Sequence, residues 1–363
     1  MNIYLAHTPY HILLTLAIAY YRDTNTEHYL FIVGDFKNAR GIYAKLQELP
    51  LFKKVWFLPG NYKRNMLYEA IILKKNTYTI QKLLKRYLLP KDTRLNVFIF
   101  NDRRPEDQLL MYLNKKYYRG VNYYVEDGIA IYADMGGLRS IHPVEKILRK
   151  LYFGFWYTPV NILGTSEYID IVLATEPTLV IDSIKIRHPV LKINKSIFDG
   201  VVKSGVVEQV FVLDDSIKNK IMSSKKVALV LVPHSSVLAK GMKRKYCEHT
   251  AKIITHLLQE NYEVLLKHHP RERLEDITYL CNMHYVKNNI TVIPRNIPIE
   301  IVYFLLRNRE NVVIYGFPSS AILTARLILG LDKKKKIISF WDDSFNVELK
   351  KVFKKLSISV NEQ

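Results

Sequence analysis

The residues best suited to chemistry follow a short apolar run at positions 264–266. They are a lysine, two histidines, a proline and an arginine in succession: Lys267, His268, His269, Pro270 and Arg271. An imidazole flanked by cations can bind an anionic ligand and donate a proton to it near neutral pH. The proline disfavours helical backbone at His269, so we expect this imidazole on a sharply defined turn. The pattern indicates the edge of an active site.

The dipeptide His-Pro alone is weak evidence, because it is also a common surface turn. It occurs three times, beginning at His142, His188 and His269. Only the third copy follows an apolar strand pattern and has cations on both sides. The first two therefore serve as internal comparisons.

A second candidate is the pair of carboxylates Glu126 and Asp127, which follows the apolar run 122–125 and precedes Gly128. Adjacent residues at the end of a strand point to opposite faces. One carboxylate can then face a cleft while backbone donors or a basic neighbour hold the other. An ordinary acidic turn is the alternative, since Asp-Gly favours turns.

The third candidate is a pair of hydroxyls, Ser319 and Ser320, at the expected start of a helix behind Gly316. A helix N-terminus binds phosphate through its free N–H groups, although capping alone explains one serine. Glu300, in the first turn of another helix, is placed to accept from ribose hydroxyls, or is simply stabilised by the helix dipole. Ser235, in the loop 233–236, could complete the pocket. No Walker or dinucleotide motif and no metal-ligand spacing is present, so we expect metal-free chemistry.

These residues require a scaffold that brings strand ends together. Apolar runs predict strands at 2–6, 29–33, 54–58, 96–100, 122–125, 170–174 and 179–186, and then at 210–213, 227–232, 264–266, 290–292, 311–315 and 336–339. Helical patterns lie between them, at 12–21, 38–46, 68–88, 106–114, 214–222, 246–260, 299–306 and 319–329. The alternation predicts an α/β protein with two Rossmann-like domains, residues 1–204 and 205–363, facing each other across a cleft. Ligands should bind at the carboxyl ends of the strands.

The composition is strongly basic. The 363 residues include 54 Lys and Arg against 34 Asp and Glu, a formal charge of +20. Such a field favours anionic partners: nucleic acid, anionic lipid or a polyanionic glycan. No RNP, KH or zinc-finger pattern is present, so we expect no nucleic acid partner. A merely soluble basic surface is the alternative.

The segment 140–157 places basic residues among aliphatic and aromatic ones, as in a helix that docks on an anionic membrane. The alternative is that its aromatic face packs into the first domain. Two cysteines without metal spacing, no signal peptide and no apolar span long enough for a bilayer predict residence in the cytoplasm.

The three candidates together carry a family resemblance. Glu126-Asp127-Gly128, His269-Pro270 and Ser319-Ser320, in this order, resemble the three short motifs of the bacterial sialyltransferases. These include the lipooligosaccharide enzymes of glycosyltransferase family 52 and the capsular polysialyltransferases. The match spans most of the chain. One departure is that some family 52 members place their base in the second domain, about twenty residues before the His-Pro, where this chain has no obvious counterpart.

The resemblance implies a GT-B fold, a CMP-sialic acid donor held mainly by the second domain, and inversion without a metal or other cofactor. Glu126 would be the general base, with Asp127 beside it, and His269 the general acid. The other residues assigned to the donor are Lys267, Pro270, Arg271, Glu300, Gly316, Ser319, Ser320 and Ser235. The residues assigned to a glycan acceptor, galactose-terminated or sialylated, are His7, Tyr10, Asn101 and Asp102.

The sequence thus predicts a membrane-peripheral sialyltransferase at the inner face of the cell membrane that acts on a bacterial surface glycan, lipooligosaccharide or capsule. A homodimer remains open. The alternatives are a glycosyltransferase with another nucleotide-activated sugar, and a non-catalytic protein that binds membrane or nucleic acid.

Overall fold

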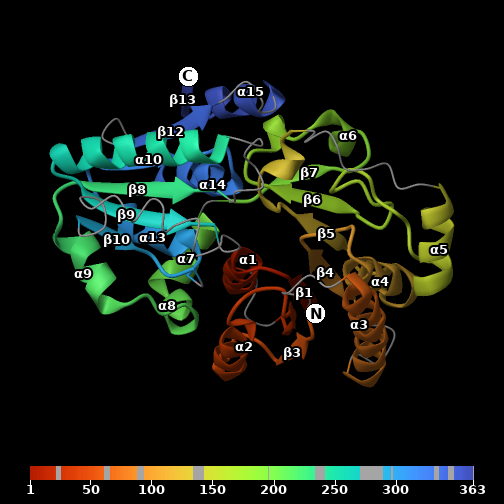
Figure 1. Ribbon diagram of the computed structural model, residues 1–363. Helices are drawn as coiled ribbons and strands as arrows, with labels where there is room; N and C mark the ends of the chain where they lie inside the picture. Colours follow the sequence, from red (N-terminus) through yellow and green to blue (C-terminus); the bar gives the residue numbers. More distant parts are fainter. Residues whose placement is uncertain are drawn as a thin grey trace. The chain divides into compact units, whose positions relative to one another are not determined.

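The computed structural model describes residues 1–21, 26–60, 66–87, 94–133, 143–194, 196–233, 242–269, 289–295, 297–330, 335–341 and 347–362. The chain divides into two compact units, Met1–Val210 and Phe211–Gln363. Each unit is built on one parallel sheet with helices on its faces (Figure 1).

The first unit holds a seven-stranded sheet in the order β3-β2-β1-β4-β5-β6-β7. Its strands are β1 (Asn2–Ala6), β2 (His28–Val33), β3 (Lys54–Leu58), β4 (Asn96–Ile99), β5 (Asn122–Val125), β6 (Ile171–Ala174) and β7 (Val190–Lys192). The chain reverses direction across the sheet between β1 and β4. At such a reversal the carboxyl ends of two neighbouring strands leave a crevice where ligands bind.

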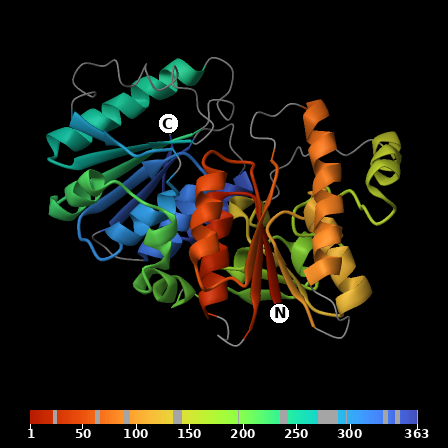
Figure 2. The same ribbon diagram turned by 90° about the horizontal axis from the view of Figure 1, so that it is seen from below.

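The helices of the first unit are α1 (Pro9–Tyr21), α2 (Ala39–Glu48), α3 (Met66–Tyr87), α4 (Pro105–Leu113), α5 (Pro143–Phe153), α6 (Asp182–Lys185), α7 (Ser196–Lys203) and α8 (Val206–Val210). α1 and α2 cover one face of the sheet, and α3 and α4 cover the other (Figure 2). α1 is apolar on all sides and its residues 11–19 are buried, because it packs against β1, α7 and α8. It is the central helix of this unit.

The second unit holds a six-stranded sheet in the order β10-β9-β8-β11-β12-β13. Its strands are β8 (Val227–Val232), β9 (Glu263–His268), β10 (Ile290–Val292), β11 (Val312–Gly316), β12 (Lys335–Trp341) and β13 (Ser359–Glu362). Its helices are α9 (Asp215–Ser223), α10 (Met242–Gln259), α13 (Ile299–Leu306), α14 (Ser320–Leu329) and α15 (Val347–Lys355). α10 packs its apolar side on β8 and β9 and closes one face of the sheet. Here the reversal lies between β8 and β11.

Two predicted strands are wrong. Residues 179–186 form a turn of 3-10 helix (Pro177–Leu179) and the short helix α6. Val180 and Ile184 are both buried there, four residues apart, which is a helical and not an alternating spacing. In the run 210–213, Phe211 and Leu213 are buried and Val212 is exposed, but this alternation belongs to a connecting segment and not to a strand.

The division between the units also differs from the prediction. The sequence places it after residue 204, whereas contacts place it after Val210. The reason is α8, which packs against α1 and α2 of the first unit. The strand β7 lies in a stretch where the sequence predicts no strand. Its residues are mostly exposed at the edge of the sheet, so they carry no apolar pattern.

Candidate active site

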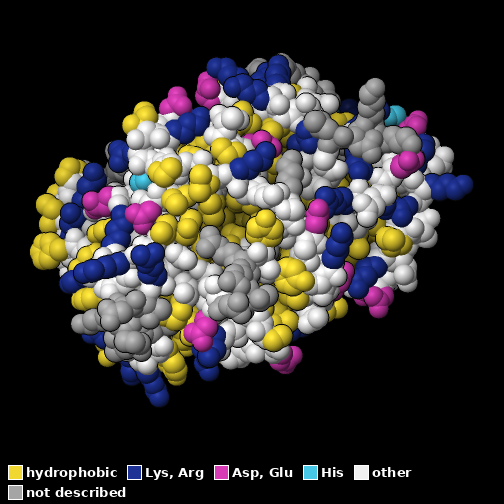
Figure 3. Space-filling view, turned by 180° about the vertical axis from the view of Figure 1, so that it is seen from behind, with side chains coloured by type: hydrophobic (Ala, Val, Ile, Leu, Met, Phe, Trp, Pro, Cys, Tyr) yellow, Lys and Arg dark blue, Asp and Glu magenta, His cyan; other side chains and the backbone are white. Residues whose placement is uncertain are grey.

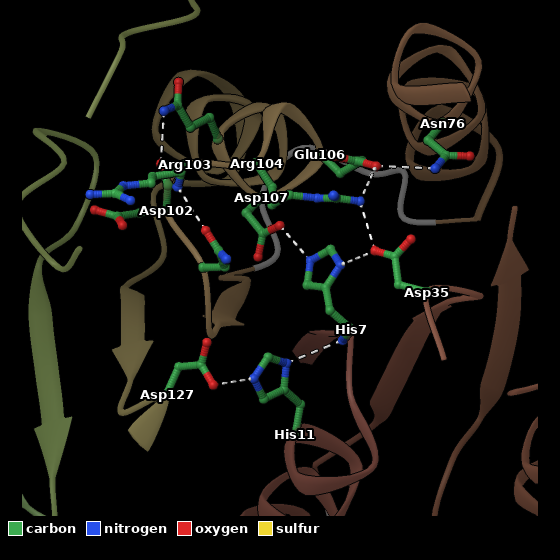
Figure 4. A network of polar contacts seen from close by, with 12 residues as sticks. His7, His11, Asp35, Asn76, Asp102, Arg103, Arg104, Glu106, Asp107 and Asp127 are labelled. Carbon is green, nitrogen blue, oxygen red and sulfur yellow. Dashed lines mark hydrogen bonds and ion pairs between the residues drawn. The ribbon is translucent and has the colours of Figure 1, made fainter. Parts of the chain in front are cut away.

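An imidazole and a carboxylate meet at the carboxyl edge of the first sheet (Figure 4). Asp127 comes two residues after the end of β5, and His11 lies in the first turn of α1. The Nε2 atom of His11 is 2.8 Å from Oδ1 of Asp127. The other ring nitrogen, Nδ1, accepts the backbone N–H of His7 at 3.2 Å. The neutral ring therefore carries its proton on Nε2 and donates it to Asp127.

The surroundings fix this pair in place. The His11 ring is stacked on Phe100, with centroids 4.4 Å apart and planes 9° from parallel. The His11 side chain is 1% exposed, whereas that of Asp127 is 31% exposed. Asp127 is thus a carboxylate that solvent or a substrate can reach, held by a partner that neither can reach.

Glu126 points the other way and is 1% exposed. Its carboxylate accepts hydrogen bonds from the hydroxyl of Tyr132, from the backbone N–H of Thr175 at 2.7 Å and from the Thr175 hydroxyl at 2.9 Å. Burial raises the pKa of Glu126, and these donors partly offset that effect. The two carboxylates do point to opposite faces. The expected base, Glu126, is however the enclosed one, and it ties the end of β5 to the residue after β6.

His7 lies in a buried cluster of charges beside this pair (Figure 4). Its Nε2 atom is 2.7 Å from Asp107, and its Nδ1 atom is 3.5 Å from Asp35. Arg104 contacts Asp35 at 2.8 Å. Burial lowers the pKa of His7, but the carboxylates of Asp107 and Asp35 outweigh burial and raise it to about 9. His7 is therefore a buried cation at neutral pH that anchors the loop leading into α1.

Because of this arrangement, the first unit should become less stable at alkaline pH. The pKa of His7 rises from 6.5 in the unfolded chain to about 9 in the folded one. Its stabilisation is fully present below pH 6.5 and is lost as the pH rises through 9, for a total of roughly 3 kcal/mol. We expect the urea midpoint of the first unit to fall across this range. His7→Gln should flatten the fall, and His256→Ala, at an exposed site, should not. An equally steep fall in His7→Gln would contradict this role.

The other three residues expected to bind an acceptor divide into two groups. Asp102 is fully buried and accepts the N–H groups of Gly164 at 3.1 Å and Ser166 at 2.9 Å. Burial raises the pKa of Asp102 to about 6, against the opposing effect of these donors. It is therefore enclosed, as His7 is. Tyr10 and Asn101 are partly exposed.

In the second unit the two adjacent histidines face different ways at the end of β9. His268 is buried, and its Nε2 atom accepts from the guanidinium of Arg295 at 2.7 Å. His269 is partly exposed, and its backbone N–H donates to the carbonyl of Val232, the last residue of β8, at 2.9 Å. The strand therefore places His269 beside the reversal point of this sheet. Pro270, Arg271 and Ser235, and the comparison residue His142, lie outside the described residues.

Lys267 and Glu300 are both buried, and each affects the pKa of the other. Lys267 is 6% exposed and donates to the carbonyl of Pro294 at 2.6 Å. Burial lowers its pKa to about 8, which Glu300 partly offsets. Burial likewise raises the pKa of Glu300 to about 7, which Lys267 partly offsets. Lys267 thus holds the segment that leads into α13, so its contribution to a donor site would be indirect.

The start of α14 lies at the carboxyl end of β11, the strand across the reversal from β8. Ser319 is the N-cap, and its hydroxyl accepts the backbone N–H of Ile322 at 3.4 Å. Ser320 is exposed in the first turn. Gly316 has a packing role, because a Cβ atom there would lie 2.8 Å from Cβ of Leu231 on β8. The two serines present hydroxyls and free N–H groups of a ten-residue helix, which suits phosphate.

The sequence did not reveal His11 as a functional residue, nor Tyr132 and Thr175 as the partners of Glu126. The available signal was the spacing of four between His7 and His11 across Pro9, where a helix can begin. Within the described residues, no group of three or more His, Cys, Asp or Glu could hold a metal ion.

Comparison with known families decides what kind of enzyme this is. Residues 2–336 match the model of the alpha-2,8-polysialyltransferase (POLYST) family. The chain belongs to this family. A polysialyltransferase is a glycosyltransferase that uses a nucleotide-sugar donor and a glycan acceptor. The prediction of a glycosyltransferase, rather than a non-catalytic binding protein, is therefore confirmed. No curated protein sequence matches the chain.

Solved structures support the fold of this polysialyltransferase. An alpha/beta-galactoside alpha-2,3-sialyltransferase from Photobacterium phosphoreum is 13% identical, with a TM-score of 0.59 over 99% of this chain and 97% of the other. A UDP-GlcNAc 2-epimerase from Methanocaldococcus jannaschii is 14% identical, with a TM-score of 0.55 over 100% and 88%. One from Neisseria meningitidis, bound to UDP-GlcNAc, is 12% identical, with a TM-score of 0.55 over 97% and 85%. The predicted fold class, two parallel α/β domains of the GT-B type, is confirmed.

Proposed function

We propose that this polysialyltransferase transfers sialic acid from CMP-sialic acid to the end of a sialylated bacterial surface glycan, with inversion at the anomeric carbon. The observation that carries the proposal is the Asp127–His11 pair at the carboxyl edge of the first sheet. A sialylated end is favoured over a galactose end because an alpha-2,8 linkage needs a hydroxyl on an eighth carbon, which a hexose lacks. The net charge of +20 suits such an anionic acceptor.

In the proposed step, Asp127 removes the proton from the acceptor 8-hydroxyl as its oxygen attacks the anomeric carbon of the donor. The bond between that carbon and the phosphate oxygen of CMP breaks, and the configuration inverts. His269 donates a proton to the departing phosphate and returns to neutrality. Asp127 replaces Glu126 as the proposed base because only Asp127 is exposed enough to contact an acceptor.

His11 acts through Asp127 and is a positioning residue. Because Nδ1 is occupied by the backbone N–H of His7, the ring cannot take a second proton without losing that bond. It therefore serves as a fixed donor that holds the carboxylate in one rotamer. Stacking on Phe100 prevents the ring from turning. A base held in this way is in the productive orientation in most molecules before the substrate binds.

The second unit supplies groups suited to the donor. Ser319 and Ser320 offer hydroxyls and the N-terminus of α14 to the phosphate. Glu300 is 6% exposed, so only a small part of its side chain could accept hydrogen bonds from the ribose hydroxyls. We propose that no metal or other cofactor takes part, since His269 and the helix dipole can balance the charge on CMP. The reaction is proposed to occur at the inner face of the cell membrane.

The donor is tested by ligand-induced stabilisation. We expect saturating CMP, at about 100 times its Kd, to stabilise the second unit by about 2.7 kcal/mol, and UDP or ADP to have far less effect. Scanning calorimetry measures this shift. In parallel, product formation from CMP-sialic acid should continue in EDTA with a sialylated acceptor. Equal stabilisation by UDP would favour the alternative of another nucleotide sugar, as the UDP-GlcNAc fold neighbours allow.

A further inference from the structure

Helix α5 exposes an apolar stripe. None of its residues is buried. Its large apolar side chains, with that of Phe155 just beyond it, are between 42% and 82% exposed: Val144, Ile147, Leu148, Leu151, Tyr152 and Phe155. The sequence left open whether this helix packs into the first unit or docks elsewhere. The aromatic end of the segment does pack into the first unit, because Trp156 stacks on Tyr112 of α4 and Tyr157 is 1% exposed. The stripe does not, because each of its large apolar side chains is at least 42% exposed.

Helix α3 continues this surface. Its buried side chains face the first unit. Its exposed side chains recur every three or four residues and so lie on one outward side of the helix. That side carries the apolar residues Tyr68 at 53%, Ile71 at 63% and Tyr78 at 67% exposed. Between and beyond them lie the exposed lysines Lys74, Lys75, Lys82 and Lys85.

The two helices are joined side by side. The hydroxyl of Tyr152 on α5 donates to the carbonyl of Ala70 on α3 at 3.1 Å. The ammonium of Lys74 donates to the carbonyl of Tyr152 and lies 5.4 Å from the centre of its ring. We call the outward sides of α3 and α5 together the α3–α5 face. In Figure 3, hydrophobic side chains interspersed with Lys and Arg gather at the edge where α5 lies.

Positive charges outnumber negative ones on this face. α3 carries Lys74, Lys75, Lys82, Lys85 and Arg86 against Glu69, and α5 carries Lys146, Arg149 and Lys150 against Glu145. Arg149 is paired with Glu145 at 2.7 Å. Aliphatic and aromatic side chains beside lysines suit the boundary between acyl chains and anionic headgroups. A soluble glycan would match the lysines but would leave the aliphatic side chains uncovered.

We propose that the α3–α5 face docks this enzyme on an anionic lipid bilayer. The stripe of α5 enters the headgroup boundary, and the lysines of both helices contact anionic headgroups. This docking is independent of the proposed reaction, because neither helix contributes a residue to the Asp127–His11 pair or to the donor groups.

Vesicle sedimentation tests the proposal. The full chain should pellet with vesicles of phosphatidylglycerol and phosphatidylcholine, but not with phosphatidylcholine alone, and added salt should weaken the binding. The triple variant Ile147→Ser, Leu151→Ser and Phe155→Ser should bind at least tenfold more weakly. The matched control is Ile186→Ser, Val212→Ser and Val347→Ser, whose side chains are 84%, 60% and 62% exposed elsewhere. It should bind as the wild type does.

Charge is tested separately with two double variants that lose the same net charge. Each basic residue near an anionic surface contributes about fivefold in affinity, so Lys146→Gln with Lys150→Gln should lose about 25-fold. Lys192→Gln with Lys225→Gln, at exposed sites elsewhere, should lose far less. Transfer to a short soluble acceptor should be unchanged in all four variants, which separates this proposal from that of the reaction.

Three outcomes would overturn the proposal. One is equal binding to neutral and anionic vesicles, and another is equal loss in the apolar variant and its control. The third is a wild-type dimer in light scattering that the Ile147, Leu151 and Phe155 variant converts to a monomer without lipid. That result would assign the face to a second copy of the chain.

Discussion

Asp127→Asn is expected to lower kcat by about 10² to 10⁴-fold while leaving CMP binding and the melting temperature nearly unchanged. The amide keeps the size of the carboxylate and can still accept from His11, so the site should remain assembled. What it loses is the ability to take a proton. Single-turnover transfer from CMP-sialic acid measures the loss, and calorimetry measures the fold. Asp182→Asn, at a side chain that is 88% exposed, should retain full activity.

Glu126→Gln should behave in the opposite way. Tyr132 and both donors of Thr175 point at its carboxylate, and an amide would turn its NH2 group toward one of them. We expect a loss of about 1 to 3 kcal/mol in the free energy of unfolding, with kcat per folded molecule largely kept. If Glu126→Gln instead abolishes turnover at full stability while Asp127→Asn stays active, the base is Glu126, as the motif alone suggests.

The second large effect is expected at His269. His269→Ala should lose about 10² to 10⁴-fold in kcat, and unlike Asp127→Asn it should also weaken CMP binding, because the imidazole faces the phosphate in the proposed step. Isothermal titration with CMP separates the two variants. His256→Ala supplies a matched control at an exposed histidine of the same unit, and His188→Ala tests a second His-Pro dipeptide. Normal turnover in His269→Ala would remove it from the mechanism.

Most of the sheet framework could be predicted from the sequence, because buried parallel strands are short apolar runs. The strands β1, β3, β5, β8 and β10 have the predicted bounds. The predictions of strands fail where buried residues do not pair in a sheet, or where exposed residues do. Val180 and Ile184 are apolar without lying on a strand, and β7 is a strand whose residues are mostly exposed. Which apolar residues pair depends on tertiary contacts that a local pattern does not contain.

The candidate site was predictable in its location and less so in its orientation. The sequence placed the Glu126-Asp127 pair and His269 after strand ends, and these residues do lie at the carboxyl edges of the two sheets. The sequence could not show which of two adjacent carboxylates faces outward, because that depends on donors 49 residues away at Thr175. His7 and Asp102 looked like ligand-binding residues but are buried by partners from distant segments.

The helix that carries His11 has a further consequence for dynamics. Residues 11–19 of α1 are buried, and the backbone N–H of His11 donates to the hydroxyl of Thr8 at 3.1 Å. Amides of such a helix exchange with solvent deuterium only in the rarest openings of a protein. The partner of the base should therefore be among the last parts of the first unit to open. Its geometry would exist before any substrate arrives, so sugar binding need not first assemble it.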